Sequence, residues 1–310
     1  IPDNTEKLDK WAFFQNTGKE AVSDSANASE KKGGVVHLYV STEDKLGSKV
    51  DTVNNGNSNV QKIIVGDMPN TDLPWNVTDF TYNTEGTAIT GLSDTGKEKI
   101  KNKPAIVLPD KGPSGKLITE IGAGVNEVGL FGVKDGETLY EPESVELPSG
   151  LTKIGNFAFS GSKFKSIAFP ETLTTIGMSA FSNSALESVT LPDSVISLGA
   201  GAFSNSIHLK SVRISSGLKT ISASAFIMTA IEDLTVPEGV TTIDRMAFSG
   251  AHVKRVKLPS TLTTIGTKAF MNHQIASLTI PENVTKIDSS AFTITQEELD
   301  HTLTSLTLNG

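Results

Sequence analysis

The chain has 310 residues, 37% of them hydrophobic, and its 27 basic and 35 acidic side chains give a formal net charge of -8. The acidic surplus argues against nucleic acid as the main partner, because phosphate binding needs a basic surface. No stretch approaches the roughly 18 apolar residues of a membrane-spanning helix, so no membrane insertion is expected, and the absence of cysteine excludes disulfides, thiol catalysis and cysteine-ligated metals.

The length favours two units, or one elongated unit with an appendage. Residues 1–75 are expected to form a small β-rich N-terminal region or extension, since β-branched runs at 35–40 and 60–65 are bounded by Gly, Asn and Ser. The chain begins Ile1-Pro2-Asp3, with neither a Met nor a basic-then-apolar leader, which indicates a mature chain whose signal peptide has been removed.

Residues 76–143 are interpreted as a transitional N-terminal cap with a degenerate first repeat. Residues 80–82 and 88–92 have strand character, and residues 93–100 form a helical turn with Ser93 or Asp94 as the N-cap.

Two later segments of this cap, residues 105–109 and 118–122, echo the two apolar phrases of the repeats that follow. A terminal unit of this kind is atypical because one of its faces meets solvent.

Residues 144–310 contain seven copies of one pattern, the last of them atypical. Each copy ends in a phenylalanine, and successive phenylalanines are 22 or 23 residues apart. They are Phe159, Phe181, Phe203, Phe226, Phe248, Phe270 and Phe292. A fixed period of this length predicts a solenoid, in which each unit buries its apolar face only by stacking on its neighbours.

Each unit divides into three segments. An apolar-x-x-apolar-x-apolar pattern ending in proline, as in 186–192, predicts a strand. A short extended piece follows, as in 173–177, and the segment around Ala180-Phe181 is predicted to be a helical turn whose aromatic ring joins a continuous column.

Two irregularities interrupt the period. One extra residue falls at 206–208, and the last unit inserts residues 293–302, within which 296–300 are expected to be helical. The chain then ends just after a strand pattern, which leaves an open edge or a continuation.

The pattern I-x-L-P, L-T-x-I and A-F resembles the BspA-type leucine-rich repeats of bacterial surface proteins, and residues 89–100 resemble the segment that precedes such repeats in some Gram-positive cell-surface proteins. The resemblance implies a β-rich α/β solenoid, a right-handed leucine-rich repeat array of about 22-residue units. It also implies an exported, non-enzymatic protein, extracellular or attached to the cell wall, that serves adhesion. Residues 1–75 lie outside it.

The sequence departs from this family where a cysteine commonly follows the A-F pair. The residues found there are Asn183, Asn205, Met228, Gly250 and Asn272.

The sequence contains no recognisable catalytic or cofactor-binding pattern. The five histidines are scattered, with no H-x-x-x-H or H-E-x-x-H spacing, and are expected on loop surfaces. No catalytic, cofactor-binding or metal-ligating residue is therefore assigned, and no cofactor is expected.

The outward positions of the strands carry the remaining information. The second position of each strand pattern alternates in sign from Lys165 through Glu187 to Lys254. Since parallel strands lie about 4.8 Å apart, opposite charges are expected to face each other in a self-neutralising, solvated ladder.

The alternative reading is a local basic excess that docks an acidic protein surface or an anionic glycan. The candidate partner-binding residues are Lys210, Arg213, Lys254, Arg255 and Lys257.

The function expected is a macromolecule-binding surface for a protein ligand: a host matrix or cell-surface protein, or another bacterial surface component. A structural spacer that projects a separate adhesive domain and a carbohydrate-binding module are the alternatives.

Overall fold

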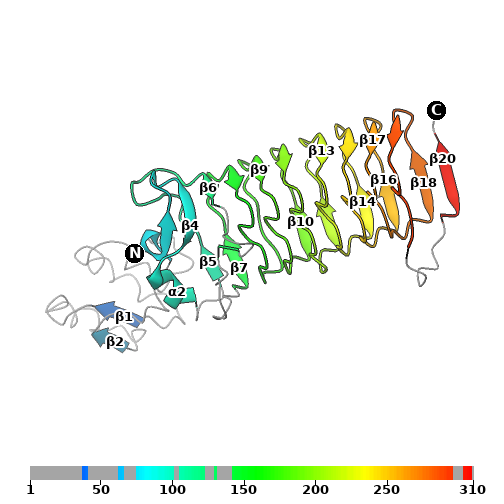
Figure 1. Ribbon diagram of the computed structural model, residues 1–310. Coiled ribbons are helices and arrows are strands. Elements are labelled where there is room, and N and C mark those ends of the chain that lie inside the picture. The colour runs from blue at the N-terminus through cyan, green and yellow to red at the C-terminus, as the bar shows by residue number, and fades with distance from the viewer. Residues whose placement is uncertain are drawn as a thin grey trace, which may run out of the picture. The chain divides into compact units, whose positions relative to one another are not determined.

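Figure 1 shows the computed structural model of the chain, in which residues 37–40, 62–65, 75–100, 105–122, 129–130, 142–295 and 303–308 are described. The chain divides into two units, residues 1–74 and 75–310. In the first, β1 (His37–Val40) and β2 (Lys62–Val65) form a parallel pair at the two runs predicted to be strands. The rest of the expected N-terminal region, and the helix expected at 296–300, lie outside the described residues.

A short cap opens the second unit. Its elements are the 3-10 helix η3 (Val77–Asp79), β3 (Phe80–Tyr82), β4 (Ala88–Leu92) and α2 (Asp94–Ile100). Ser93 is the N-cap of α2, because its Oγ accepts a hydrogen bond from the Gly96 amide at 3.2 Å. β3 pairs antiparallel with β4, and β4 pairs parallel with the first short strand of the coils that follow.

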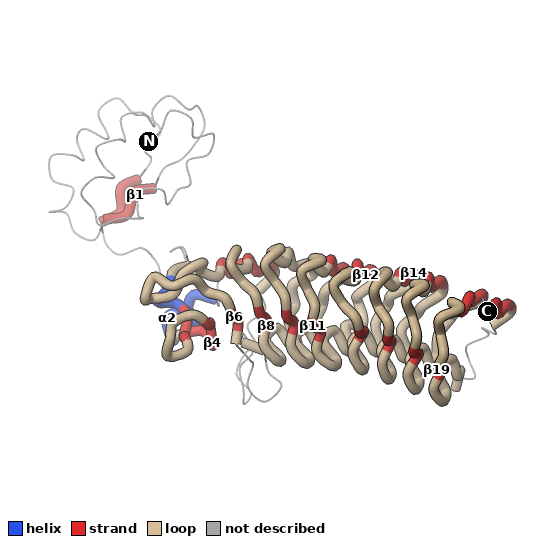
Figure 2. The backbone as a smooth tube through the Cα atoms, turned by 90° about the horizontal axis from the view of Figure 1, so that it is seen from above, coloured by secondary structure: helices blue, strands red, loops and turns tan. Residues whose placement is uncertain are grey.

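The chain then winds in successive coils, with longer strands on one side and two-residue strands on the other (Figures 1 and 2). The coil at residues 164–181 lacks a longer strand. The long strands are β5 (Ala105–Val107), β7 (Ser144–Glu146), β10 (Ser188–Thr190), β12 (Ser211–Arg213), β14 (Asp233–Thr235), β16 (Arg255–Lys257), β18 (Ser277–Ile280) and β20 (Ser305–Leu308). The short strands are β6 (Glu120–Ile121), β8 (Lys153–Ile154), β9 (Thr175–Ile176), β11 (Ser197–Leu198), β13 (Thr220–Ile221), β15 (Thr242–Ile243), β17 (Thr264–Ile265) and β19 (Lys286–Ile287). Wherever strands of the coils pair, they pair in parallel. The long strands do so as four pairs, β5–β7, β10–β12, β14–β16 and β18–β20.

We call the coils rungs 1 to 7, from the one that ends in Phe159 to the one that ends in Phe292. The predicted phenylalanine column exists: adjacent rings lie 5.2–5.4 Å apart between centroids and are within 15° of parallel. In rung 3 the side chains of Val189, Leu191, Leu198 and Phe203 are all buried. The apolar half of the repeat is therefore committed to packing, as the solenoid interpretation requires.

The segment around each phenylalanine is not the predicted helical turn. Its amides bond to the next rung instead of within a helix: Phe159 N donates to Ala180 O at 2.7 Å, and Phe181 N donates to Ala202 O at 2.7 Å. The amides that alternate with these donate to the carbonyl three residues back, as Ser160 N does to Phe157 O at 3.0 Å. The segment is therefore a series of turns through residues with positive φ.

Positive φ explains the residues that replace the family's cysteine. Asn183, Asn205, Gly250 and Asn272 have φ between 56° and 66°, a region that glycine and asparagine tolerate best. Met228 adopts the same conformation, with φ of 57°, so at this position rung 4 carries backbone strain that asparagine or glycine relieves in rungs 2, 3, 5 and 6.

Both sheets are interrupted. The short strands form one sheet up to β11 and another from β13, and the break coincides with the extra residue at 206–208. The Ser222 hydroxyl donates to the Leu198 carbonyl across this gap. The side-chain hydrogen bond thus replaces part of the missing backbone ladder.

On the side of the long strands, the break between β7 and β10 corrects the predicted strand of rung 2, because residues 166–168 form no strand. Phe164 and Phe169 stand where rung 3 has leucines, and both rings pack edge-on against the column, at 5.8 Å from Phe159 and 5.6 Å from Phe181. Phe164 is fully buried, whereas Phe169 is only half-buried, as expected where a ring takes the place of a smaller leucine. The strand is therefore displaced from the ladder positions of its neighbours.

Candidate binding surface

The outward side chains of the long strands form the surface that packing leaves free. In β10, β12 and β14 the middle residue is buried and the two flanking residues are exposed. Register places Asp233 beside Arg255 and Thr235 beside Lys257. We call this surface, with the turn that follows each strand, the strand face.

Ion pairs join neighbouring rungs across the strand face, as the alternating signs predict. Those among the described residues are Lys165 to Glu187 (3.1 Å), Arg213 to Asp193 (2.8 Å), Lys254 to Glu232 (2.9 Å) and Arg255 to Asp233. Exposed pairs of this kind contribute about 0–1 kcal/mol each. The ladder neutralises charge more than it stabilises the fold.

The acids respond to these partners. Hydrogen bonds from the Arg213 guanidinium and from Ser216 lower the pKa of Asp193 to about 2. Hydrogen bonds from Lys254 to Glu232 and from Arg255 to Asp233 hold the pKa of each carboxyl below its usual range. These carboxylates therefore remain charged and paired with their basic partners at neutral pH.

All five residues of the predicted basic patch are exposed on the strand face, but ion pairing reduces its charge. Arg213, Lys254 and Arg255 are paired with acids. Lys210 and Lys257 have no ion pair among the described residues. The positive charge outside ion pairs is thus confined to these two lysines, in rungs 4 and 6. Hydrogen bonds from Ser260 lower the pKa of Glu238, and the charge of Lys257 contributes to this shift.

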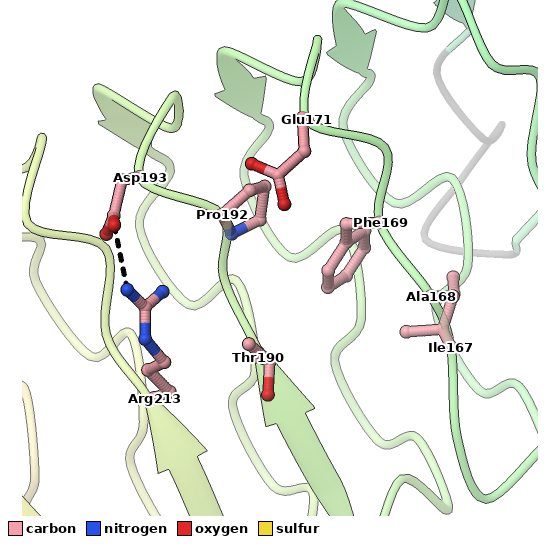
Figure 3. A pocket seen from close by; sticks show the side chains of 8 residues that line it. All are labelled: Ile167, Ala168, Phe169, Glu171, Thr190, Pro192, Asp193 and Arg213. Atoms are coloured by element: carbon pink, nitrogen blue, oxygen red, sulfur yellow. Dashed lines mark hydrogen bonds and ion pairs between the residues drawn. The ribbon is translucent and has the colours of Figure 1, made fainter.

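A groove lies on the same face at rung 2, where the strand is missing (Figure 3). Its volume is about 530 Å³. Its apolar lining includes Ile167, Phe169 and Pro192, its polar lining includes Glu171 and Thr190, and the Arg213–Asp193 pair closes one end. Sequence reasoning missed it, although Phe169 in place of the usual leucine was a visible signal.

The described residues contain neither a metal-binding group nor a membrane-spanning helix. Among the described residues no three His, Asp or Glu side chains gather as a metal-binding group would require. None of the helices in that part of the chain is long and apolar enough to cross a bilayer.

His273 corrects the expectation that the histidines lie on loop surfaces, because its side chain is only 1% exposed. It occupies the place that Ser184 and Ser206 hold in earlier rungs, where both hydroxyls are buried and bonded to each other at 2.9 Å. Its Nδ1 accepts a hydrogen bond from the Ile275 amide at 2.8 Å, and its ring lies edge-on to Phe292. The burial of His273 could have been predicted from its position in the repeat, which is buried in other rungs. The spacing between the histidines carries no such information.

Burial lowers the pKa of His273 below its ordinary value of 6.5, and a hydrogen bond to the Phe292 backbone offsets part of this shift. The unfolded chain therefore takes up the proton at higher pH than the folded one, so stability is complete above about pH 6.5 and falls as the pH drops through the folded pKa. We expect the wild type to lose more stability than His273→Ser between about pH 7.5 and about pH 5.5, as measured by denaturant unfolding. Equal losses in the two proteins would contradict this.

The repeats of this chain match those of a known protein family. The family model for the BspA type leucine rich repeat region matches residues 139–251 and 223–308, with six copies. The chain belongs to the BspA-type leucine-rich repeat family. The family resemblance and the solenoid predicted from the sequence are thereby confirmed.

Three solved structures are similar to this chain, and the one with a TM-score above 0.5 agrees with the leucine-rich repeat fold. A leucine-rich repeat protein from Bacteroides ovatus is 19% identical with a TM-score of 0.54, over 76% of this chain and 67% of that one. The pneumococcal vaccine antigen PcpA is 19% identical with a TM-score of 0.46, over 73% of this chain and 88% of that one. A leucine rich cell surface protein from Faecalibacterium prausnitzii is 19% identical with a TM-score of 0.40, over 79% of this chain and 96% of that one. Comparison with curated proteins gives no match.

Proposed function

We propose that this BspA-type repeat protein is a non-enzymatic binding protein that holds a protein ligand on its strand face, outside the cell or on the cell wall. The observation that carries the proposal is the division of each repeat into a fully buried set and an exposed set that no packing role explains. A long, regular and exposed strand surface is the type of binding surface that solenoids present. The family resemblance supports an exported location and an adhesive role.

Lys210 and Lys257 are the cations of this surface that are free to meet a ligand. The other three residues of the predicted patch, Arg213, Lys254 and Arg255, would first have to break an ion pair with an acid on the neighbouring rung. We therefore propose that the two lysines provide the contact with an acidic protein surface, and that the three paired cations keep the face rigid. An anionic glycan is the second choice of ligand for the same charges.

The test measures binding of the full chain to immobilised fibronectin, laminin and collagen and to a glycan array. The double variant Lys210→Glu/Lys257→Glu is expected to bind the captured protein about tenfold more weakly or worse, because it reverses both free charges. The matched control is Lys219→Glu/Lys268→Glu, which makes the same change of net charge at exposed lysines outside the long strands.

Unchanged affinity in the first variant would contradict a role for the strand-face lysines. It would favour the spacer reading, in which another part of the chain binds. Equal losses in both variants would show that net charge alone is responsible, and binding to glycans without any protein would favour the carbohydrate-binding reading.

A further inference from the structure

The turn after each long strand carries a column of acids and serines, one per rung. Here an acid is bonded to a serine of the next rung. Asp110 Oδ1 accepts from the Ser149 amide at 2.7 Å and from its hydroxyl at 2.9 Å, and Glu238 accepts from the amide and hydroxyl of Ser260 at 3.1 and 2.9 Å. The pairing works because the neighbouring position offers donors instead of a second negative charge.

Glu171 is the exception inside the array. It follows Pro170 at the same place in rung 2, but the next rung offers Asp193, whose carboxylate is already bonded to Arg213 and to the Ser216 amide. Glu171 is exposed and makes no hydrogen bond or ion pair among the described residues. The groove therefore carries one free negative charge at its rim (Figure 3).

The floor beneath Glu171 is apolar. Ile167 and Phe169 are half-buried here, whereas their counterparts in rung 3, Val189 and Leu191, are 3% and 0% exposed. A ring face beside a free carboxylate suits a cation, since the ring quadrupole and the carboxylate attract it together. Three departures from the repeat thus meet in one groove: the missing strand, the exposed ring and the unbonded acid.

A sugar is a poor match for this lining. Of the polar side chains that line the groove, Arg213 and Asp193 already bond to each other, which leaves a sugar ring the Thr190 hydroxyl and the Glu171 carboxylate. Sugar hydroxyls that are desolvated without partners cost free energy. A peptide can place an apolar side chain on that floor. Its volume of about 530 Å³ lies within the range of ligand pockets, about 300–1,000 Å³.

We propose that the rung 2 groove binds a short extended segment of a partner protein in which a lysine or arginine stands beside an apolar side chain. The basic group lies along the Phe169 ring and pairs with Glu171, and the apolar neighbour packs on Ile167 and Pro192. This inference rests on the proposed protein-binding function of the strand face and specifies one segment that the face recognises.

The experiment selects random linear peptides displayed on phage against the immobilised full chain, and then measures the selected consensus as a synthetic peptide by fluorescence anisotropy. The wild-type pool is expected to be enriched in lysine or arginine next to an aliphatic or aromatic residue. Its consensus should bind Glu171→Gln about tenfold more weakly, as expected for the loss of one charge-assisted hydrogen bond. Glu282→Gln is the matched control, because Glu282 is an exposed acid at the same place in rung 7, and it should bind like the wild type.

A second variant, Phe169→Leu, restores the residue that rung 3 carries at this place and removes the ring from the floor. It should also bind the peptide more weakly, with its circular dichroism spectrum unchanged. A pool without basic enrichment, no selected peptide at all, or equal affinity for the wild type, Glu171→Gln and Phe169→Leu would overturn the proposal. The proposal would also be overturned if a cationic glucosamine oligomer displaced the peptide and bound the wild type, Glu171→Gln and Phe169→Leu with equal affinity.

The two proposals fail separately. Peptide binding that depends on Glu171 but not on Lys210 and Lys257 would keep the groove and reject the lysine contact. The reverse result would keep the strand-face lysines and reject the groove.

Discussion

Replacement of Phe226 by alanine is expected to lower the free energy of unfolding by about 3–5 kcal/mol. The ring is fully buried in the middle of the column and stacks on Phe203 and Phe248, each 5.4 Å away between centroids. Alanine would leave a cavity that neither neighbour can fill, because each is held by its own rung. Denaturant unfolding followed by circular dichroism measures the loss.

The matched control is Phe292→Ala at the end of the column. Phe292 stacks on one ring of the column, Phe270, and is only half-buried, so its loss should cost about half as much or less. Because the stability of a solenoid is a sum of nearest-neighbour terms, the variant at Phe226 should also broaden the transition by uncoupling rungs 1–3 from rungs 5–7. Equal losses at the two positions would show that stacking between rungs contributes little.

The core could be predicted because it depends on period alone. In a stacked coil, residues one period apart lie directly over each other, so the spacing from Phe181 to Phe203 already implies a column. The same logic applies to the apolar positions Val189, Leu191 and Leu198, and all three are buried. The period of the sequence therefore predicts which side chains stack on one another along the solenoid.

Features that depend on contacts between non-equivalent positions could not be predicted in this way. Arg213 bonds to Asp193, a turn residue of the preceding rung, whereas the sequence compared only strand positions with strand positions. The predicted basic patch therefore counted Arg213 as free. The absent strand of rung 2 likewise depends on how two rings fill one interior, a matter of shape that a hydrophobic pattern does not contain.

Replacement of Lys99 by methionine is expected to destabilise the N-terminal cap by about 3–5 kcal/mol, although methionine has nearly the same volume. Lys99 and Asp79 have side chains that are 1% and 3% exposed, and they form a buried ion pair between α2 and η3. The ammonium group also lies 5.4 Å from the centroid of the Trp75 ring. The variant would leave a buried carboxylate without its counter-charge, and that desolvation cost is larger than the packing it keeps.

The control for Lys99 lies on the same helix. Lys97 pairs with Asp94 at 3.3 Å, but its side chain is 49% exposed, so Lys97→Met should change the free energy of unfolding by less than about 0.5 kcal/mol. Adding Asp79→Asn to Lys99→Met should restore much of the loss, because the amide oxygen can still accept the Asn76 amide hydrogen, which Asp79 receives at 2.8 Å, without a buried charge. If the double variant is no more stable than Lys99→Met, the lysine stabilises the cap through its aliphatic chain and the Trp75 ring, and the ion pair serves to orient η3 against α2. Recovery would show instead that the cap needs the lysine because Asp79 is charged.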